Sequence, residues 1–260
     1  MTTLSIIIVS FNARDDLDRC LSSIESSPPA MPHEVVVVDN QSTDGSTESV
    51  RRRPGVRLIE MGANTGFSRA NNAGIRASTG RLVLLLNSDT VVPPGAIDAL
   101  VKQIDARPEV AVVGPRLVNG RGEAELSFGA MISPLNELRQ KRRTQDTIER
   151  LTREPHFPDW VSGACLLVRR ADAEAVGLLD ERYFMYTEDV DFCAAIRGRG
   201  RRVLFTPEVE VVHVRGRSAA SAPAATERQY RRSHLAFYEK HHPRWVPVLK
   251  LYLRLRGLGT

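Results

Sequence analysis

Three carboxylates lie within four consecutive residues of this 260-residue chain, at Glu188, Asp189 and Asp191. The four residues before Thr187, YFMY at 183–186, are rich in rings for a chain with 6% aromatic residues. Clustered like charges and apolar walls raise a carboxyl pKa toward the range of a general base. In a helix Asp189 points about 100° away from Glu188, so one group can take a proton while its neighbours hold structure. Alternatively, the acidic first turn only complements the helix dipole.

Polar side chains also follow several apolar runs of the chain. Asp39 ends the run 34–38, and Asn87-Ser88-Asp89 ends the run 82–86. A carboxylate at such a place can accept hydrogen bonds from a pyrimidine base, or hold a hard divalent cation that bridges diphosphate oxygens. On spacing alone the alternative has equal weight: each Asp caps or starts the next turn.

His213 ends the strand-like run 209–213, on the same face as Val209 and Val211. A neutral imidazole at this position can complete a metal site, although a lone histidine is more often a satisfied core or rim residue. The segment 64–69 opens a helix whose free N–H groups can face an anion or a ribose. It is not a phosphate-binding loop of the G-K-[ST] type, and no G-x-G-x-x-G follows the first strand, which disfavours dinucleotide binding.

The elements that must position these residues alternate between strand and helix. Short apolar, β-branched runs predict strands at 4–9, 34–38, 56–61, 82–86 and 110–113, and helical periodicity predicts helices over 15–26, 65–77 and 93–106. Ser42 and Asp44 supply start signals for a further helix that runs to about residue 52. This alternation favours an α/β fold with a mostly parallel sheet flanked by helices. Because such sheets bind ligands at the carboxyl ends of their strands, Asn12, Asp39, Asn64 and Asn87–Asp89 should meet on one rim.

The second half is less regular. Residues 116–128 suggest short strands, and 134–152 suggest a charged helix or a mobile segment. We expect strands at 160–169, 201–206 and 208–214, with Thr187 as the N-cap of a helix to about residue 197. Residues 218–226 are small and predict a flexible connector, followed by a helical tail.

Composition narrows the class of protein. The chain is 42% hydrophobic and 26% charged, as an ordinary globular protein is. Cys20, Cys165 and Cys193 are far apart, which argues against a disulfide framework or a zinc cluster. No basic stretch precedes a long apolar stretch at the start, and the longest aliphatic run is five residues. We therefore expect no signal peptide, no membrane span and a cytoplasmic location.

The order of the motifs is more specific than any one of them. SIIIVSFN at 5–12, VVVVDNQSTDGS at 35–46, NTGFSRANNAG at 64–74 and LLLNSDT at 84–90 are followed by DWVSGACLLVRR at 159–170, GLLDERYFMYTEDVDFC at 177–193 and VVHVRGRS at 211–218. Over residues 4–218 this set closely resembles the family 2 glycosyltransferases, which are inverting enzymes of the GT-A fold. It is most similar to the rhamnosyltransferase-like members that build bacterial cell-surface polysaccharides.

The resemblance implies roles for individual residues. Asp189 is the catalytic base, with Glu188, Trp160 and Gly163 on the acceptor side. Asp89, the last residue of the family's D-x-D signature, and His213 hold Mn²⁺ or Mg²⁺. The residues that bind the base and ribose of the nucleotide sugar are Ser10, Asn12, Asp39, Asn64, Phe67 and Asn71. The first D-x-D position is Asn87 here, so fewer protein charges hold the cation.

The resemblance also implies a domain plan and a reaction. Residues 1–217 form the catalytic domain, with a nucleotide-binding half over about 1–115 and an acceptor half over about 116–217. The reaction is metal-assisted, inverting transfer of a sugar to a glycan or a polyprenyl-diphosphate-linked acceptor. The first candidate for the sugar is L-rhamnose, donated by dTDP-rhamnose. Two alternatives stay open, a nucleotidyltransferase acting on sugar phosphates and a non-catalytic protein that binds nucleotides or anionic surfaces.

The C-terminal extension, residues 218–260, is basic. Residues 226–260 hold eight Lys and Arg against two Glu, a net charge of +6, whereas the whole chain carries +5. Apolar residues at near-helical spacing alternate with Lys250 and Arg254, as in helices that lie on anionic membranes. Such a helix would place the protein at the inner face of the cell membrane. Packing against the body or in a homo-oligomer is the equal alternative. The acidic rim argues against nucleic acid as a partner.

Overall fold

The computed structural model describes residues 2–140, 144–214 and 223–255. The strands are β1 (Leu4–Ser10), β2 (His33–Asp39), β3 (Val56–Glu60), β4 (Leu82–Asn87), β5 (Thr90–Val91), β6 (Val110–Val118), β7 (Phe128–Gly129), β8 (Trp160–Val161), β9 (Cys165–Arg169) and β10 (Arg202–His213). The helices are α1 (Arg14–Ser26), α2 (Ser46–Arg51), α3 (Phe67–Ala77), α4 (Ala96–Asp105), α5 (Pro134–Gln140), α6 (Gln145–Leu151), α7 (Arg170–Ala175), α8 (Glu188–Gly198), α10 (Pro223–His241) and α11 (Val246–Leu255), with a 3-10 turn at Pro243–Trp245.

Eight strands form one sheet in the order β3-β2-β1-β4-β9-β6-β10-β5. β1 pairs in parallel with both β2 and β4, and β6 pairs in parallel with β10. β9 lies antiparallel between β4 and β6. The strand order reverses at β1, between β2 and β4, and such a reversal opens a crevice at the carboxyl ends of the strands. The predicted α/β architecture with a mostly parallel sheet is confirmed.

The two faces of the sheet explain why its strands are apolar throughout. Ile6 and Ile8 of β1 pack with Leu17 and Leu21 of α1 and with Leu100 of α4. On the other face Ile7 packs with residues of α3 and α8, among them Ala70, Ile75 and Phe192. Successive side chains of a strand point to opposite faces, so a strand covered by helices on both sides is apolar at every position. Cys20, Cys165 and Cys193 are all buried thiols in this core.

Several expectations for the second half need correction. The run 160–169 is two strands, because β8 pairs with β7 in a separate two-stranded sheet while β9 enters the main sheet. Residues 201–214 contain one strand, β10, whose pairing with β6 is irregular between Thr206 and Glu210. Thr187 begins α8 in a left-handed conformation (φ 64°) without a side-chain capping bond. Its hydroxyl instead donates to the Tyr186 carbonyl, 2.6 Å away.

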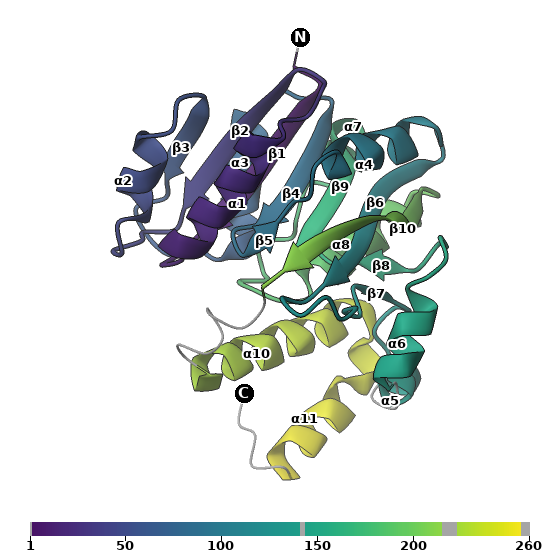
Figure 1. The fold of residues 1–260 in the computed structure, drawn as a ribbon. Helices are drawn as coiled ribbons and strands as arrows, with labels where there is room; N and C mark the ends of the chain where they lie inside the picture. Colours follow the sequence, from purple (N-terminus) through teal and green to yellow (C-terminus); the bar gives the residue numbers. More distant parts are fainter. Residues whose placement is uncertain (1, 141–143, 215–222, 256–260) are drawn as a thin grey trace.

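The C-terminal region lies beyond the carboxyl-end edge of the sheet, where α10 crosses beneath the body and α11 lies farther out (Figure 1). α10 is anchored by Phe237 and Tyr238, which are buried with Tyr183 and Val190. Most of the predicted connector, and Arg215–Ser218 with it, falls outside the described residues, while residues 223–226 already belong to α10. No helix in the described ranges is long and apolar enough to cross a bilayer.

Candidate active site

The carboxyl ends of β1, β2 and β4 bring three predicted residues together. Ser10 is the direct register partner of Asp39, and Val9 pairs with Asn87 on the other side of β1. Ser10 and Asp39 are both buried. Asp39 uses one carboxylate oxygen to accept the backbone N–H of Ser42 at 2.8 Å. Asp39 therefore stabilises the following turn, which was the alternative to a binding role. Its other carboxylate oxygen, Oδ1, has no hydrogen-bond partner among the described residues and can bind a ligand.

The loops after β1 and β2 are held against each other in strained conformations. Asn12 (φ 48°) and Gln41 (φ 69°) are both left-handed, which is uncommon for residues other than glycine. The Asn12 side chain accepts the Thr43 N–H at 2.8 Å, and the Asn12 N–H donates to Ser42 Oγ at 2.9 Å. Strained backbone of this kind concentrates at functional sites. Asn12 itself is exposed on the rim.

The start of α3 closes over the loop that precedes α8. The Phe67 N–H donates to the Phe184 carbonyl at 2.6 Å. Gly66 has φ +86°, and a Cβ at this position would lie 2.4 Å from the same carbonyl oxygen. The Asn64 side chain accepts the Gly66 N–H at 3.2 Å, so the structure gives Asn64 a turn-stabilising contact. Only glycine allows the two loops to approach this closely.

Asp189 is fixed at the centre of these loops. One carboxylate oxygen accepts the Gly163 N–H at 2.9 Å and the other accepts the Val190 N–H at 2.8 Å. A Cβ on Gly163 would lie 3.4 Å from Asp189 Cβ and 3.6 Å from the Phe67 ring. Asp189, Gly163 and Phe67 are thus neighbours although they come from three distant segments. The side chain of Asp189 is partly exposed.

Glu188 has the opposite environment. It is buried, and burial followed by the repulsion of Asp189 raises the pKa of its carboxyl well above the ordinary value. Glu188 therefore keeps its proton at pH values at which an ordinary glutamate is ionised.

Asp89 and His213 meet at the other side of the rim. His213 Nε2 lies 3.3 Å from an Asp89 carboxylate oxygen, and its Nδ1 lies 3.0 Å from Glu125 Oε2. The Val214 N–H donates to the Asp89 carbonyl at 2.8 Å, which ties the end of β10 to this turn. Burial lowers the pKa of His213, but the hydrogen bonds to Asp89 and Glu125 outweigh it and raise the pKa to about 9.

This corner suits a divalent cation. Glu125 on Nδ1 fixes the ring of His213 with Nε2 toward Asp89, so that Asp89 and His213 would be the residues to hold a cation. The buried amide oxygen of Asn87, two residues before Asp89, has no hydrogen-bond partner. Within the described ranges no group of three or more His, Cys, Asp or Glu side chains is arranged to hold an ion.

Orphaned polar atoms mark the same rim. Eight buried side-chain N or O atoms of the described residues have no hydrogen-bond partner. Five of them belong to this rim: Ser10 Oγ, Asp39 Oδ1, Asn71 Oδ1, Asn87 Oδ1 and Glu188 Oε2. A buried polar atom without a partner costs about 1–3 kcal/mol, so a cluster of them is expected where a polar ligand supplies the missing bonds.

Trp160 completes the wall on the far side. Its ring is half-buried, packs with the cluster around Tyr183, and donates through Nε1 to the Ala130 carbonyl at 3.0 Å. It lies on β8, three residues before Gly163, whose N–H donates to Asp189.

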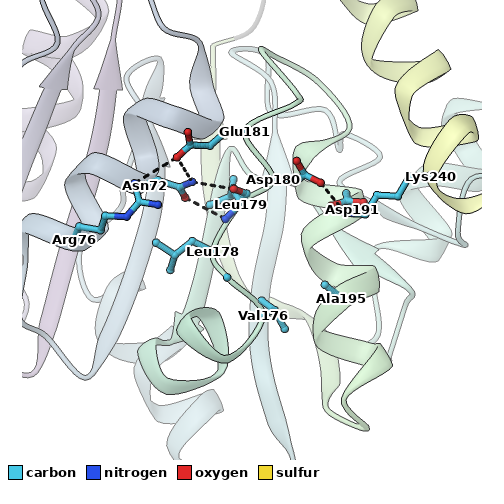
Figure 2. A pocket seen from close by; sticks show the side chains of 11 residues that line it. Asn72, Arg76, Val176, Leu178, Leu179, Asp180, Glu181, Asp191, Ala195 and Lys240 are labelled. Carbon is cyan, nitrogen blue, oxygen red and sulfur yellow. Dashed lines mark hydrogen bonds and ion pairs between the residues drawn. The ribbon is translucent and has the colours of Figure 1, made fainter.

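A separate cavity of about 310 Å³ lies among α3, the loop before α8, α8 and α10, and Figure 2 shows its lining. Its charged groups are already paired. Arg76 reaches Glu181 at 3.3 Å, and Lys240 reaches Asp180 and Asp191 at 2.8 Å each. None of the sequence-predicted site residues lines it.

Two functional contacts were not predicted. Glu125 lies in the irregular region 116–128, and no periodicity signals its contact with a histidine 88 residues away. Phe184 was noticed only as an aromatic residue, whereas its carbonyl group makes the contact with α3.

The fold is the first step in classifying the chain. It superimposes on a crystal structure of GalNAc-T7 with UDP, GalNAc and Mn²⁺ with a TM-score of 0.65 at 19% identity, covering 90% of this chain and 47% of that one. A mannosyltransferase from Pyrobaculum calidifontis, solved with GDP-Man and Mn²⁺, gives a TM-score of 0.65 at 21% identity, with 95% and 67% covered. The architecture is that of the GT-A glycosyltransferases.

The family follows from the sequence. The Glycosyl transferase family 2 profile matches residues 5–176. The chain is 32% identical over 265 aligned positions to the N-acetylglucosaminyl-diphospho-decaprenol L-rhamnosyltransferase of Mycobacterium tuberculosis, covering 93% of this chain and 86% of that protein. The chain therefore belongs to glycosyl transferase family 2 and is a glycosyltransferase. Membership excludes both alternatives, the nucleotidyltransferase and the non-catalytic binding protein.

Proposed function

We propose that this enzyme transfers L-rhamnose from dTDP-L-rhamnose, with inversion, to a hydroxyl of a sugar carried on a polyprenyl diphosphate. The carrying observation is the position of Asp189: a partly exposed carboxylate, oriented by the Gly163 N–H and next to Phe67 at the carboxyl-end rim. The choice of donor and acceptor is supported by the similar mycobacterial protein, whose name specifies rhamnose transfer to N-acetylglucosaminyl-diphospho-decaprenol. UDP-linked sugars are the second candidate donors.

The nucleotide is assigned to the rim formed by β1, β2 and α3. Asp39 Oδ1, Ser10 Oγ and Asn71 Oδ1 are buried without partners, so base and ribose groups can satisfy them. Asn12 and Asn64 lie at the edge of this rim, and Phe67 offers its ring between it and Asp189. In this assignment residues 1–115 provide the nucleotide-binding half and 116–217 the acceptor half of one catalytic domain.

Asp89 and His213 would hold Mn²⁺ or Mg²⁺. When bound, the cation neutralises charge that develops on the departing diphosphate. The residues themselves supply a carboxylate and a fixed imidazole, with Glu125 orienting the latter. Because Asn87 replaces an acidic residue at the first D-x-D position, one neutral oxygen takes the place of a negative one.

The reaction is a single displacement. Asp189 accepts the proton of the acceptor hydroxyl, whose oxygen forms a bond to the anomeric carbon as the bond to the diphosphate breaks on the opposite face. The Gly163 and Val190 N–H groups hold the carboxylate in the direction of attack. Trp160 and Glu188 are assigned to the acceptor side. The product belongs to the assembly of a cell-surface polysaccharide.

Incubation with dTDP-L-rhamnose, Mn²⁺ and a short-chain polyprenyl-diphosphate N-acetylglucosamine acceptor tests the proposal. We expect release of dTDP and an acceptor whose mass rises by one deoxyhexose. NMR should show that the transferred rhamnose has the anomeric configuration opposite to that in the donor. A parallel thermal-shift series with nucleotide diphosphates and nucleotide sugars identifies the donor, because a ligand that binds the folded state raises its melting temperature. Absence of transfer from every nucleotide sugar that binds would refute the assignment.

A further inference from the structure

The outer face of α11 is apolar and largely exposed to solvent. Val248, Leu251, Tyr252 and Leu255 follow the spacing i, i+3, i+4, i+7, which gathers them within about 100° of the helix circumference. Their exposed fractions are 54%, 58%, 45% and 79%. Trp245, in the turn just before α11, is 49% exposed. Of the nine large hydrophobic residues exposed in the described parts of the chain, five therefore lie within residues 245–255.

A different face of the same helix already packs against the body. Leu253 is buried, and Val246 and Leu249 contact the cluster of Tyr183, Val190, Phe237 and Tyr238. The expected choice between packing and surface binding is thus not exclusive, since one face of the helix packs while another is exposed to solvent. An exposed apolar face of this kind marks a contact site for a partner or a membrane.

Basic side chains border the exposed apolar face. Arg254 lies about 60° from its edge and Lys250 a further 40° away. Both are exposed, as is Arg244 beside Trp245. Lys250 is within 3.4 Å of Glu239, which is a long contact between exposed groups. The tail as a whole carries a net charge of +6 over residues 226–260. A partner that is apolar inside and negative at its surface complements this arrangement.

The position of α11 relates it to the candidate site. Both α10 and α11 lie beyond the carboxyl-end edge of the sheet (Figure 1), and the site occupies that edge. α10 also contacts the loop before α8 directly, since Ser233 Oγ donates to the Met185 carbonyl at 2.6 Å. A surface that receives α11 therefore faces the same side of the molecule as Asp189.

From this geometry we infer that α11 and Trp245 dock in the interfacial layer of an anionic phospholipid bilayer. Helices with an apolar arc, flanking Lys and Arg, and Trp or Tyr at the boundary bind at this depth. Docking would present the carboxyl-end edge to a membrane-borne acceptor. The presence of a membrane-borne acceptor rests on the proposed function. The contact with the bilayer does not, because it is inferred from the side chains of α11.

The test is binding of the full-length protein to vesicles of phosphatidylcholine with 30% phosphatidylglycerol, compared with vesicles of phosphatidylcholine alone. We expect the wild-type chain to cosediment with the anionic vesicles, and high salt to weaken the binding. The double variant L251E/L255E should lose at least about tenfold in partitioning. The matched control is L135E, on α5, because Leu135 is also 58% exposed but lies outside the proposed face; it should bind like the wild-type chain.

The outcomes separate this inference from the competing ones. Equal partitioning of L251E/L255E and wild type would overturn it, as would absence of wild-type binding to anionic vesicles. A dimer in light scattering that L251E/L255E abolishes, without vesicle binding, would assign the face to a second copy instead. All three substituted leucines are exposed, so thermal melts of the variants should match the wild type.

Activity distinguishes the two proposals. If L251E/L255E still transfers sugar to a water-soluble acceptor analogue but loses turnover on acceptor in vesicles, both proposals stand. If the wild-type chain binds vesicles and transfers sugar to neither acceptor, the proposed function fails and the bilayer contact remains.

Discussion

Lys240 of α10 donates a 2.8 Å hydrogen bond to Asp191 of α8, a buried carboxylate two residues beyond Asp189. His241 and Tyr183 contact the other oxygen of Asp191, at 2.6 and 3.2 Å. Burial, followed by the charge of Asp191, raises the pKa of the Tyr183 hydroxyl, which keeps it a donor at neutral pH. Helix α10 is thus bonded to α8, the helix that carries the candidate base.

Lys240→Met tests this contact. The substitution removes the ammonium group and leaves Asp191 and Asp180 each short of a partner, and we expect the free energy of unfolding to fall by about 1–3 kcal/mol. Urea denaturation measures the change. Lys250→Met is the control, because the Lys250–Glu239 contact is exposed and should contribute less than about 1 kcal/mol. Equal losses in the two variants would contradict a special role for the buried contact.

Gly66→Ala tests the approach of α3 to the loop before α8. The added Cβ would lie 2.4 Å from the Phe184 carbonyl oxygen, so the loop must move. Gly62→Ala is matched to it, since Gly62 also has positive φ but has open space around it. A left-handed alanine costs about 1–2 kcal/mol, so we expect the free energy of unfolding to fall by that amount in both variants. Overpacking should lower it by about 1–3 kcal/mol more in Gly66→Ala alone. Thermal denaturation of both compares them, and a loss at 66 no larger than at 62 would exclude the steric contact.

Elements defined by local sequence patterns could be predicted from the sequence, whereas those that depend on distant pairing partners could not. The strands β1, β2 and β4 were predictable because a run of apolar residues bounded by polar ones is a local signal. The sequence predicted a shared rim at the carboxyl ends of these strands, whereas the register that pairs Ser10 with Asp39 comes from the structure. By contrast, the split of 160–169 into β8 and β9 depends on which strands they pair with, and those partners, β7, β4 and β6, are remote in the chain.

The site shows the same limit. The motif order placed Asp189, Asp89 and His213 in one site, and the structure does bring Asp89 and His213 to 3.3 Å. The contact of Glu125 with His213 joins two irregularly placed segments, and the approach of Phe184 to Phe67 uses a backbone carbonyl, which carries no residue-type signal.

Asp189→Asn should reduce sugar transfer by about 100- to 10,000-fold, because the amide cannot accept the acceptor proton. Nucleotide-sugar binding should persist, since the amide oxygen can still accept the Gly163 N–H. Turnover and calorimetric binding measured side by side separate the two effects. Asp105→Asn is a suitable control, as Asp105 forms a surface pair with Arg81 away from the rim. Near-wild-type turnover in the Asp189 variant would remove that residue from the role of base.

Asp89→Ala should weaken nucleotide-sugar binding in Mn²⁺ and leave the weaker binding without metal unchanged. Glu125→Gln should lower metal affinity by about 10- to 100-fold through its effect on His213. Calorimetry with and without Mn²⁺ measures both. Glu109→Ala, an exposed carboxylate outside the site, is the control. Metal-dependent affinity that is the same in all four proteins would argue against the Asp89–His213 cation site.

Glu188 predicts a pH dependence of stability. Burial and then Asp189 raise the pKa of its carboxyl in the folded chain, so the native state binds this proton more tightly than the unfolded state does. Stability from this group is then intact below the unfolded pKa, about 4.3 for Glu, and is lost as the pH rises toward the folded pKa. Glu188→Gln removes the ionisation, so its unfolding free energy should exceed that of the wild type at pH 8 and exceed it by less at pH 5, and the two should converge only below the unfolded pKa of about 4.3. Urea titrations at both pH values measure the gap. Glu154→Gln, in an exposed position, should show no such change. A gap for Glu188→Gln that stays constant from pH 5 to 8 would mean that the carboxyl is already ionised in the fold.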